Sequence, residues 1–172
     1  WRAKKFATVM DGLLCLFPFE PDYFKPFGLD AHFIGHPEAF GDRLPAKPEN
    51  KSVEKEKIKS NKIILLPGSR RSEISLILPE MLAATAIIKR HDPNLNFVLP
   101  AVPHLLPMIK SLVAGSGVTI LDQPEDLIPA LQTSDAMIAT SGTITLQAAL
   151  CGAVGVTCYR TSAFSGFIGR RL

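Results

Sequence analysis

The fold is decided by residues 62–73, which read Lys62-Ile63-Ile64-Leu65-Leu66-Pro67-Gly68-Ser69-Arg70-Arg71-Ser72-Glu73. Residues 63–66 form a continuous apolar run of the kind found in buried strands. Apolar side chains and one threonine then recur every three or four residues, at Ile74, Ile77, Leu78, Met81, Leu82, Thr85 and Ile88. This spacing predicts a helix, and Pro79 should either kink it or begin a second one.

Four further short apolar runs follow at similar intervals. They lie near residues 96–99, 118–121, 136–139 and 154–157, with helical patterns between them. Strand and helix in regular alternation predict an α/β fold, a Rossmann-like doubly wound parallel sheet with right-handed crossovers over residues 62–172. Upstream, residues 13–17 suit a buried strand, while residues 18–48 are so rich in proline and glycine that they read as a connection, with one short strand-like piece at residues 32–34.

The composition excludes several functional classes. The chain has 172 residues, is 47% apolar and has a net charge of +3, which the six lysines and three glutamates of residues 47–62 account for. One mixed-sign stretch is no basic face, so nucleic acid is not an expected partner. No apolar run approaches the ~20 residues of a membrane-spanning helix, and no signal peptide is visible. Three cysteines without a C-x-x-C pair suggest buried, reduced thiols.

The first candidate binding loop is the turn after the strand at residues 63–66. Gly68 allows a ligand to approach the backbone, Ser69 can cap the following helix, and Arg70 offers a planar fork of donors to phosphate oxygens. In a parallel sheet such a loop lies at the carboxyl edge, where helix N-termini present unpaired amides to ligands. An ordinary capped turn with exposed arginines remains an equal alternative.

A second and a third candidate loop follow later strands. Ser141, Gly142 and Thr143 combine two hydroxyls with a glycine at a predicted helix start, and Gln147 lies one turn further along the same face. The alternative is a plain capped helix, but two such starts on one sheet edge favour a shared ligand. Tyr159 and Arg160 follow the last strand, where they either reach the same crevice or are simply solvated. No histidine pair has the spacing of a zinc helix.

Several motifs in a fixed order carry a family resemblance. They are Phe17-Pro18-Phe19-Glu20, Phe33-Ile34-Gly35-His36-Pro37, Leu66-Pro67-Gly68-Ser69-Arg70 with Glu73, Ser141-Gly142-Thr143 and Tyr159-Arg160. In this order and spacing the chain resembles the lipid-A-disaccharide synthase family, whose members are about twice as long on the scale of two domains. The resemblance implies a GT-B glycosyltransferase fragment. Residues 1–35 would be a remnant of the N-terminal domain, residues 36–61 a lysine-rich interdomain linker, and residues 62–172 a UDP-sugar-binding Rossmann-like domain truncated at its C-terminus.

The resemblance also implies an activity. A family member is a hexosyltransferase that moves 2,3-diacylglucosamine from UDP-2,3-diacylglucosamine to 2,3-diacylglucosamine 1-phosphate in lipid A biosynthesis, with the UDP-sugar as substrate and neither cofactor nor metal. The implied UDP contacts are Gly68, Ser69, Arg70, Ser141, Gly142, Thr143, Gln147, Tyr159 and Arg160. Arg70 would stabilise the charge of the leaving UDP. The family commonly has Glu at the position of Gln147, which leaves its role in binding ribose open.

The resemblance also implies a cellular location and partners, and it leaves alternative functions open. The family implies a cytoplasmic enzyme, peripheral on the cytoplasmic face of the inner membrane of a Gram-negative-type bacterium. Trp1, Phe6 and the basic residues around them would belong to its membrane-facing surface or to a solvated helix end. The missing N-terminal domain, or a second copy, would have to complete the enzyme, so the fragment alone is expected to be inactive. The alternatives are another GT-B enzyme acting on a UDP-sugar, namely a UDP-GlcNAc epimerase or a peptidoglycan-precursor glycosyltransferase, and a non-catalytic split-gene product.

Overall fold

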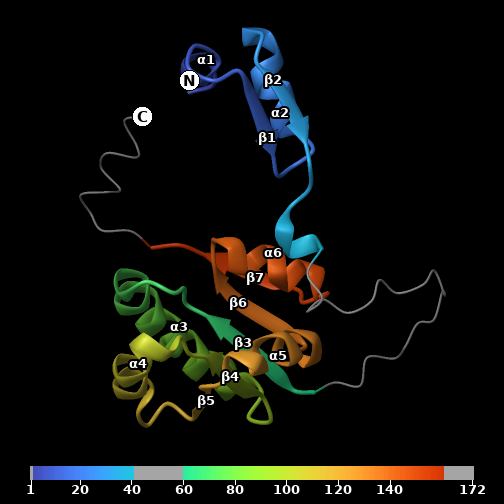
Figure 1. The fold of residues 1–172 in the computed structure, drawn as a ribbon. Helices are drawn as coiled ribbons and strands as arrows, with labels where there is room; N and C mark the ends of the chain where they lie inside the picture. Colours follow the sequence, from blue (N-terminus) through green and yellow to red (C-terminus); the bar gives the residue numbers. More distant parts are fainter. Residues whose placement is uncertain (1, 41–59, 161–172) are drawn as a thin grey trace, which may run out of the picture. The chain divides into compact units, whose positions relative to one another are not determined.

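The computed structural model describes residues 2–40 and 60–160, which belong to two compact units, Trp1–Leu44 and Pro45–Leu172 (Figure 1). Most of the lysine-rich stretch lies outside the described residues, and so do residues 164–172, where the sequence predicts a further helix. The domain boundaries at residues 35/36 and 61/62 therefore stay predictions.

The second unit contains a parallel sheet of five strands. They are β3 (Lys62–Leu66), β4 (Asn96–Pro100), β5 (Val118–Leu121), β6 (Ala136–Thr140) and β7 (Gly155–Cys158). Their order across the sheet is β5-β4-β3-β6-β7, and every neighbouring pair is parallel. The predicted doubly wound α/β fold is confirmed, and each predicted strand lies within one residue of its observed bounds.

The strand order fixes where a ligand can bind. From β3 the chain moves outward through β4 to β5, and then returns to the other side of β3 to form β6 and β7. The order reverses between β3 and β6, so the connections that leave these two strands depart in opposite directions. A crevice at the carboxyl ends of the strands, at such a switch point, is the usual ligand site of open α/β sheets.

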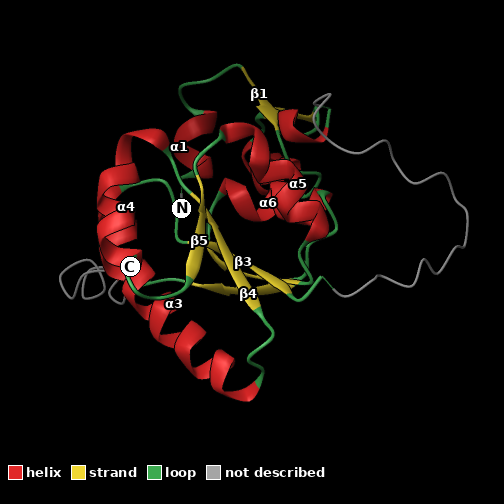
Figure 2. Cartoon of the chain, turned by 90° about the horizontal axis from the view of Figure 1, so that it is seen from below, coloured by secondary structure: helices red, strands yellow, loops and turns green. Residues whose placement is uncertain are grey.

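Helices cover both faces of this sheet (Figure 2). They are α3 (Arg71–His91), α4 (Leu106–Val113), α5 (Leu127–Thr133) and α6 (Thr143–Leu150), with short 3-10 turns η3 (Pro103–Leu105) and η4 (Pro124–Asp126) before α4 and α5. One apolar cluster joins the sheet to α3 and α4, and a second joins its other face to α5 and α6. Alternate residues of β3 enter the two clusters, Ile63 and Leu65 the first and Ile64 and Leu66 the second, as strand pleating requires.

The helix α3 runs unbroken through Pro79, so no second helix begins there. Pro79 is exposed, whereas Ile77, Leu78 and Met81 around it are at most 2% exposed. The buried side of the helix stays continuous because the proline ring lies on the solvent side, where the loss of one backbone hydrogen bond is tolerated more easily.

The first unit is more structured than its composition suggested. It contains α1 (Ala3–Ala7), β1 (Gly12–Cys15), α2 (Glu20–Phe24), η1 (Lys25–Phe27), β2 (Asp30–Phe33) and η2 (Pro37–Ala39). The interpretation of residues 18–48 as a connection is wrong for the helix α2. The strand-like piece expected at residues 32–34 overlaps β2, which begins at Asp30 and pairs in parallel with β1. The expected buried strand is also shorter, and only Cys15 within it is buried.

The cysteines differ from one another in exposure. Cys15 is buried, Cys151 is half-buried and Cys158 is exposed, so the expectation of three buried thiols is wrong for Cys158. Cys158 ends β7, a strand whose residues are all exposed in the described part of the unit. No helix in residues 2–40 and 60–160 has the length and apolar character needed to cross a membrane.

Asp135 ties the starts of two central strands together and makes stability depend on pH. Its Oδ1 accepts a hydrogen bond from the backbone N–H of Ser60 at 3.2 Å, and the backbone N–H of Asp135 donates to the carbonyl of Lys62. The hydrogen bond from Ser60 is the main cause that lowers the pKa of the Asp135 carboxyl below its usual value. A lowered pKa stabilises the fold above about pH 4, and this contribution is lost as the pH falls through the lowered value.

Asp135→Asn removes this titrating carboxyl. As the pH is lowered below about 4, we therefore expect the melting temperature of Asp135→Asn to fall less steeply than that of the parent chain. Thermal melting of both proteins across this pH range measures the difference, and parallel curves of melting temperature against pH would contradict this role of Asp135.

Candidate functional site

The two glycine loops leave neighbouring strands at one edge of the sheet. Leu66 at the end of β3 pairs with Ala139 of β6, so Gly68 and Gly142 each come two or three residues after a paired position. The strands are parallel, and both loops therefore lie at the carboxyl edge, on the two sides of the switch point. The expectation that the first and second candidate loops share one edge of the sheet is confirmed.

Glu73 closes the first loop onto the start of α3. Its Oε2 accepts hydrogen bonds from the backbone N–H groups of Ser69 at 3.1 Å and Arg70 at 3.2 Å, and its Oε1 accepts one from Nη1 of Arg70 at 2.8 Å. The Glu73 side chain is only 15% exposed, whereas that of Arg70 is 79% exposed. A carboxylate three residues into a helix is well placed to satisfy these amides.

This arrangement corrects two expectations about the first loop. The N-cap of α3 is Arg70 rather than Ser69, since the helix begins at Arg71. The amides of Ser69 and Arg70 are not unpaired, because Glu73 already occupies both. What the loop presents to a ligand is therefore the exposed guanidinium of Arg70, held from one side by Glu73.

Gly68 has a conformation that other residues rarely adopt. Its φ is +103°, and a Cβ added there would collide with the Glu73 carboxylate. Glycine is thus required at this position for the backbone angle and for the close approach of Glu73.

The second loop is open. Ser141, Gly142 and Thr143 are exposed, and α6 begins at Thr143. The φ of Gly142 is 167°, an extended angle open to any residue, and a Cβ added there would have no atom of residues 2–40 or 60–160 within 4 Å beyond its chain neighbours. Neither backbone strain nor packing explains a glycine here, whereas room for a ligand would. Gln147 lies half-buried in α6, one turn beyond Thr143.

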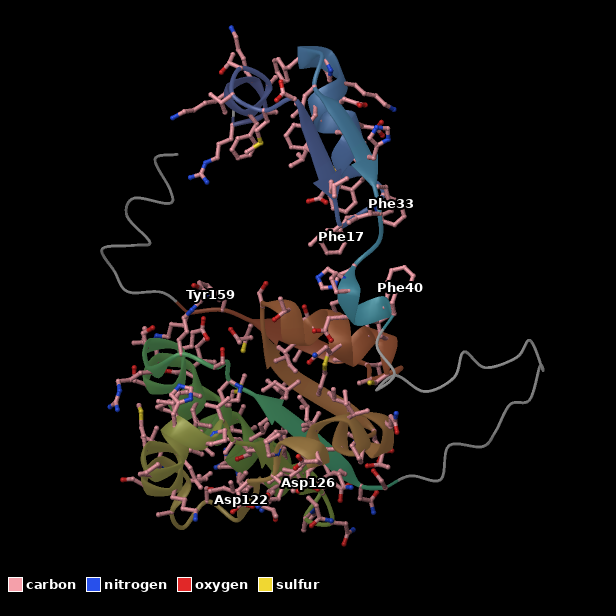
Figure 3. All side chains as sticks on the ribbon, viewed as in Figure 1. Phe17, Phe33, Phe40, Asp122, Asp126 and Tyr159 are labelled. Carbon is pink, nitrogen blue, oxygen red and sulfur yellow. The ribbon has the colours of Figure 1, made fainter. Side chains whose placement is uncertain are left out.

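The third loop follows β7, the neighbour of β6. Tyr159 lies just past the end of β7 and is 65% exposed (Figure 3). The Nη1 of Arg160 forms an ion pair with Oε1 of Glu80 in α3, so this guanidinium is tied to the helix that follows the first loop. The third loop is thereby linked to the α3 side of the sheet.

Two guanidinium groups lie at this edge, and each is paired with a glutamate of α3, Arg70 with Glu73 and Arg160 with Glu80. The N-terminus of α6 adds the partial positive charge of a helix start, which suits an anion. Among the described residues no group of three or more His, Cys, Asp or Glu side chains could hold a metal ion.

Two features of this edge were not predicted from the sequence, namely the capping role of Glu73 and the buried hydroxyl of Thr140. Glu73 stands at the third position of the helix, where an acidic residue often caps a helix, and this spacing was a usable signal. The buried hydroxyl of Thr140 had no such signal, because its burial depends on how β6 packs.

A known protein family matches the chain from end to end. A protein-family profile described as lipid-A-disaccharide synthetase matches residues 1–172. The lipid-A-disaccharide synthases of Paraburkholderia phytofirmans and Burkholderia vietnamiensis are 39% and 38% identical to the chain; in each case 99% of this chain and 44% of the relative are aligned. The chain thus spans less than half the length of these curated relatives.

Solved structures share the fold at low sequence identity. A putative UDP-N-acetylglucosamine 2-epimerase from Listeria monocytogenes has a TM-score of 0.61 at 16% identity, covering 95% of this chain and 46% of its own. A variant of S. aureus TarM, solved in complex with UDP and two other ligands, has a TM-score of 0.55 at 12% identity, covering 96% and 33%. These similarities support the Rossmann-like fold. With the family profile matching from end to end, the chain belongs to the lipid-A-disaccharide synthetase family.

Proposed function

We propose that this chain is the nucleotide-binding part of a lipid-A-disaccharide synthase. The whole enzyme would transfer 2,3-diacylglucosamine from UDP-2,3-diacylglucosamine to 2,3-diacylglucosamine 1-phosphate and release UDP. The observation that carries the proposal is the pair of glycine loops on both sides of the switch point, in a chain that the family profile matches throughout.

The diphosphate of UDP would bind at the carboxyl edge of β3 and β6. When the bond between the sugar and the diphosphate breaks, negative charge develops on the departing UDP. The exposed guanidinium of Arg70 can donate charge-assisted hydrogen bonds to phosphate oxygens, and the start of α6 offers the amides near Thr143. Gly142 would leave room for this approach, since no atom of the described part of the chain, apart from its own neighbours in sequence, lies within 4 Å of the Cβ position.

The remaining site residues would contact other parts of the nucleotide. Ser141 and Thr143 would donate hydroxyl hydrogen bonds, Gln147 would face the ribose, and Tyr159 would offer an aromatic face. Arg160 would act from its position against Glu80. Gly68 and Ser69 would contribute by shaping the loop that carries Arg70, because Glu73 takes the amides of Ser69 and Arg70.

The disaccharide synthase is favoured over an epimerase. The epimerase similarity rests on 16% identity and shows the fold alone, whereas the synthases are 36–39% identical over nearly the whole chain. A peptidoglycan-precursor glycosyltransferase has no comparable support among these relatives.

Substrates with two acyl chains also imply a location. We propose peripheral contact with the cytoplasmic face of the inner membrane, supported by the basic residues Lys4 and Lys5 beside Phe6 in α1. The acceptor site and the general base would belong to the part of the relatives that this chain does not span, supplied by an N-terminal domain or a second copy. The 172-residue chain alone is expected to bind UDP without forming disaccharide.

Calorimetric titration of the 172-residue chain with UDP and UMP tests the proposal. We expect UDP to bind about tenfold or more tightly than UMP, because the second phosphate adds charge-assisted hydrogen bonds. ADP serves as the control for nonspecific diphosphate binding and should bind more weakly than UDP. No binding of UDP, or equal affinities for UDP and UMP, would contradict a diphosphate site.

A further inference from the structure

The side chain of Thr140, at the end of β6 beside the candidate loops, carries a buried hydroxyl without a hydrogen-bond partner among the described residues. The residue is the last of β6 and is 3% exposed. Within the described part of the chain, its Oγ1 is the one buried side-chain nitrogen or oxygen atom that has no partner. An unpaired buried hydroxyl costs stability, so a folded domain that keeps one invites an explanation.

Other buried hydroxyls of this unit are satisfied. Oγ1 of Thr85 donates to the carbonyl of Leu82 at 2.8 Å, and Oγ of Ser134 donates to the carbonyl of Ala130 at 2.6 Å. Thr85 and Ser134 are 2% and 0% exposed, so they are buried as deeply as Thr140. The unpaired state of Thr140 is therefore a property of its position.

The strand pattern sets the direction of the Thr140 side chain. Met137 and Ala139 belong to the cluster under α5 and α6, whereas Ala136 and Ile138 pack against the cluster under α3 and α4. Alternation along β6 places Thr140 with Ala136 and Ile138, on the face covered by α3. The second loop thus begins with a side chain directed to the helix that follows the first loop.

Register places Thr140 between all three loops. Its neighbour Ala139 pairs with Leu66, directly before the Gly68 loop, and Thr140 itself pairs with Cys158, directly before Tyr159. The next residues along its own strand are Ser141 and Gly142.

We propose that the Thr140 hydroxyl donates a hydrogen bond to the diphosphate of the bound nucleotide. The inference rests on the proposed function. Because Oγ1 is covered in the structure described here, the residues that cover it must move aside when the nucleotide enters. Thr140 is then a substrate-binding residue whose donor is unused until UDP binds.

Thr140→Val and Thr140→Ser separate this role from a structural one. Valine keeps the shape and removes the hydroxyl, so we expect UDP affinity to fall about tenfold while the melting temperature stays the same or rises. Serine keeps the hydroxyl and loses a methyl group, so we expect a lower melting temperature with UDP affinity within about twofold of the parent. Thr85→Val is the matched control, because it removes a satisfied hydroxyl away from the site and should leave UDP affinity unchanged.

Calorimetry and thermal melting of the 172-residue chain and these three variants decide the matter. Equal UDP affinities of the parent and Thr140→Val would overturn the inference while leaving the proposed function intact. So would a Thr140→Val protein that melts at a lower temperature, since the hydroxyl would then have a partner within the fold. If the parent chain itself does not bind UDP, the proposed function fails and the inference fails with it.

Discussion

Replacing Arg70 with alanine is expected to weaken the binding of UDP about 10- to 100-fold. Arg70 is the exposed cation that the first loop presents at the switch point, with 79% of its side chain accessible. A hydrogen bond to a charged group contributes ~1.5–3 kcal/mol, and ~1.4 kcal/mol corresponds to a factor of ten in affinity. Titration calorimetry of the 172-residue chain and of Arg70→Ala measures the difference directly.

The loss should come from binding rather than from folding. The ion pair between Arg70 and Glu73 lies at the surface, where such pairs contribute ~0–1 kcal/mol, so the melting temperature of Arg70→Ala should stay close to that of the parent. Arg70→Lys keeps the charge without the planar fork and should bind UDP with intermediate affinity.

Arg71→Ala is the matched control for the loss of one positive charge. Arg71 is the neighbouring exposed arginine and the first residue of α3. Its replacement by alanine removes one positive charge, as Arg70→Ala does. We expect Arg71→Ala to bind UDP almost as well as the parent. Equal affinities for the parent and Arg70→Ala, or equal losses in Arg70→Ala and Arg71→Ala, would exclude a specific phosphate contact by Arg70.

The central strands of the second unit's sheet could be predicted from the sequence because they are buried on both faces. Such strands are continuous apolar runs, and residues 63–66 and 96–99 could be recognised without knowledge of their neighbours. The first unit lacks this signal. Leu14 and Phe33 on its two strands are 66% and 51% exposed. The prolines and glycines between these strands indicated a connection rather than the helix α2.

The candidate site was predictable only as far as topology determines it. The alternation of strands and helices was enough to place the Gly68 and Gly142 loops at one edge. It could not show that Glu73 occupies the amides of the first loop, or that Thr140 lacks a partner, because both depend on distances between side chains. The sequence therefore predicted the placement of the two loops more accurately than the donors that they present.

Alanine at the two loop glycines is expected to have different effects, although both loops are assigned to the same ligand. Gly68→Ala should lower the free energy of unfolding by ~1–3 kcal/mol, because a non-glycine residue is strained at a φ of +103° and its Cβ would collide with Glu73. Displacing Glu73 also releases Arg70, so UDP affinity should fall as well. Chemical denaturation and calorimetry of the variant measure the two effects separately.

Gly142→Ala tests the approach of the ligand separately from the stability of the fold. Its extended backbone and empty surroundings accept a methyl group, so stability should change by no more than ~0.5 kcal/mol. If the diphosphate uses the space beside Gly142, the same methyl group should weaken UDP binding about tenfold by blocking hydrogen bonds to the start of α6. A Gly142→Ala protein with normal stability and normal UDP affinity would show that the nucleotide does not approach this loop. A destabilised variant would instead assign Gly142 to the fold, and the contrast with Gly68 would disappear.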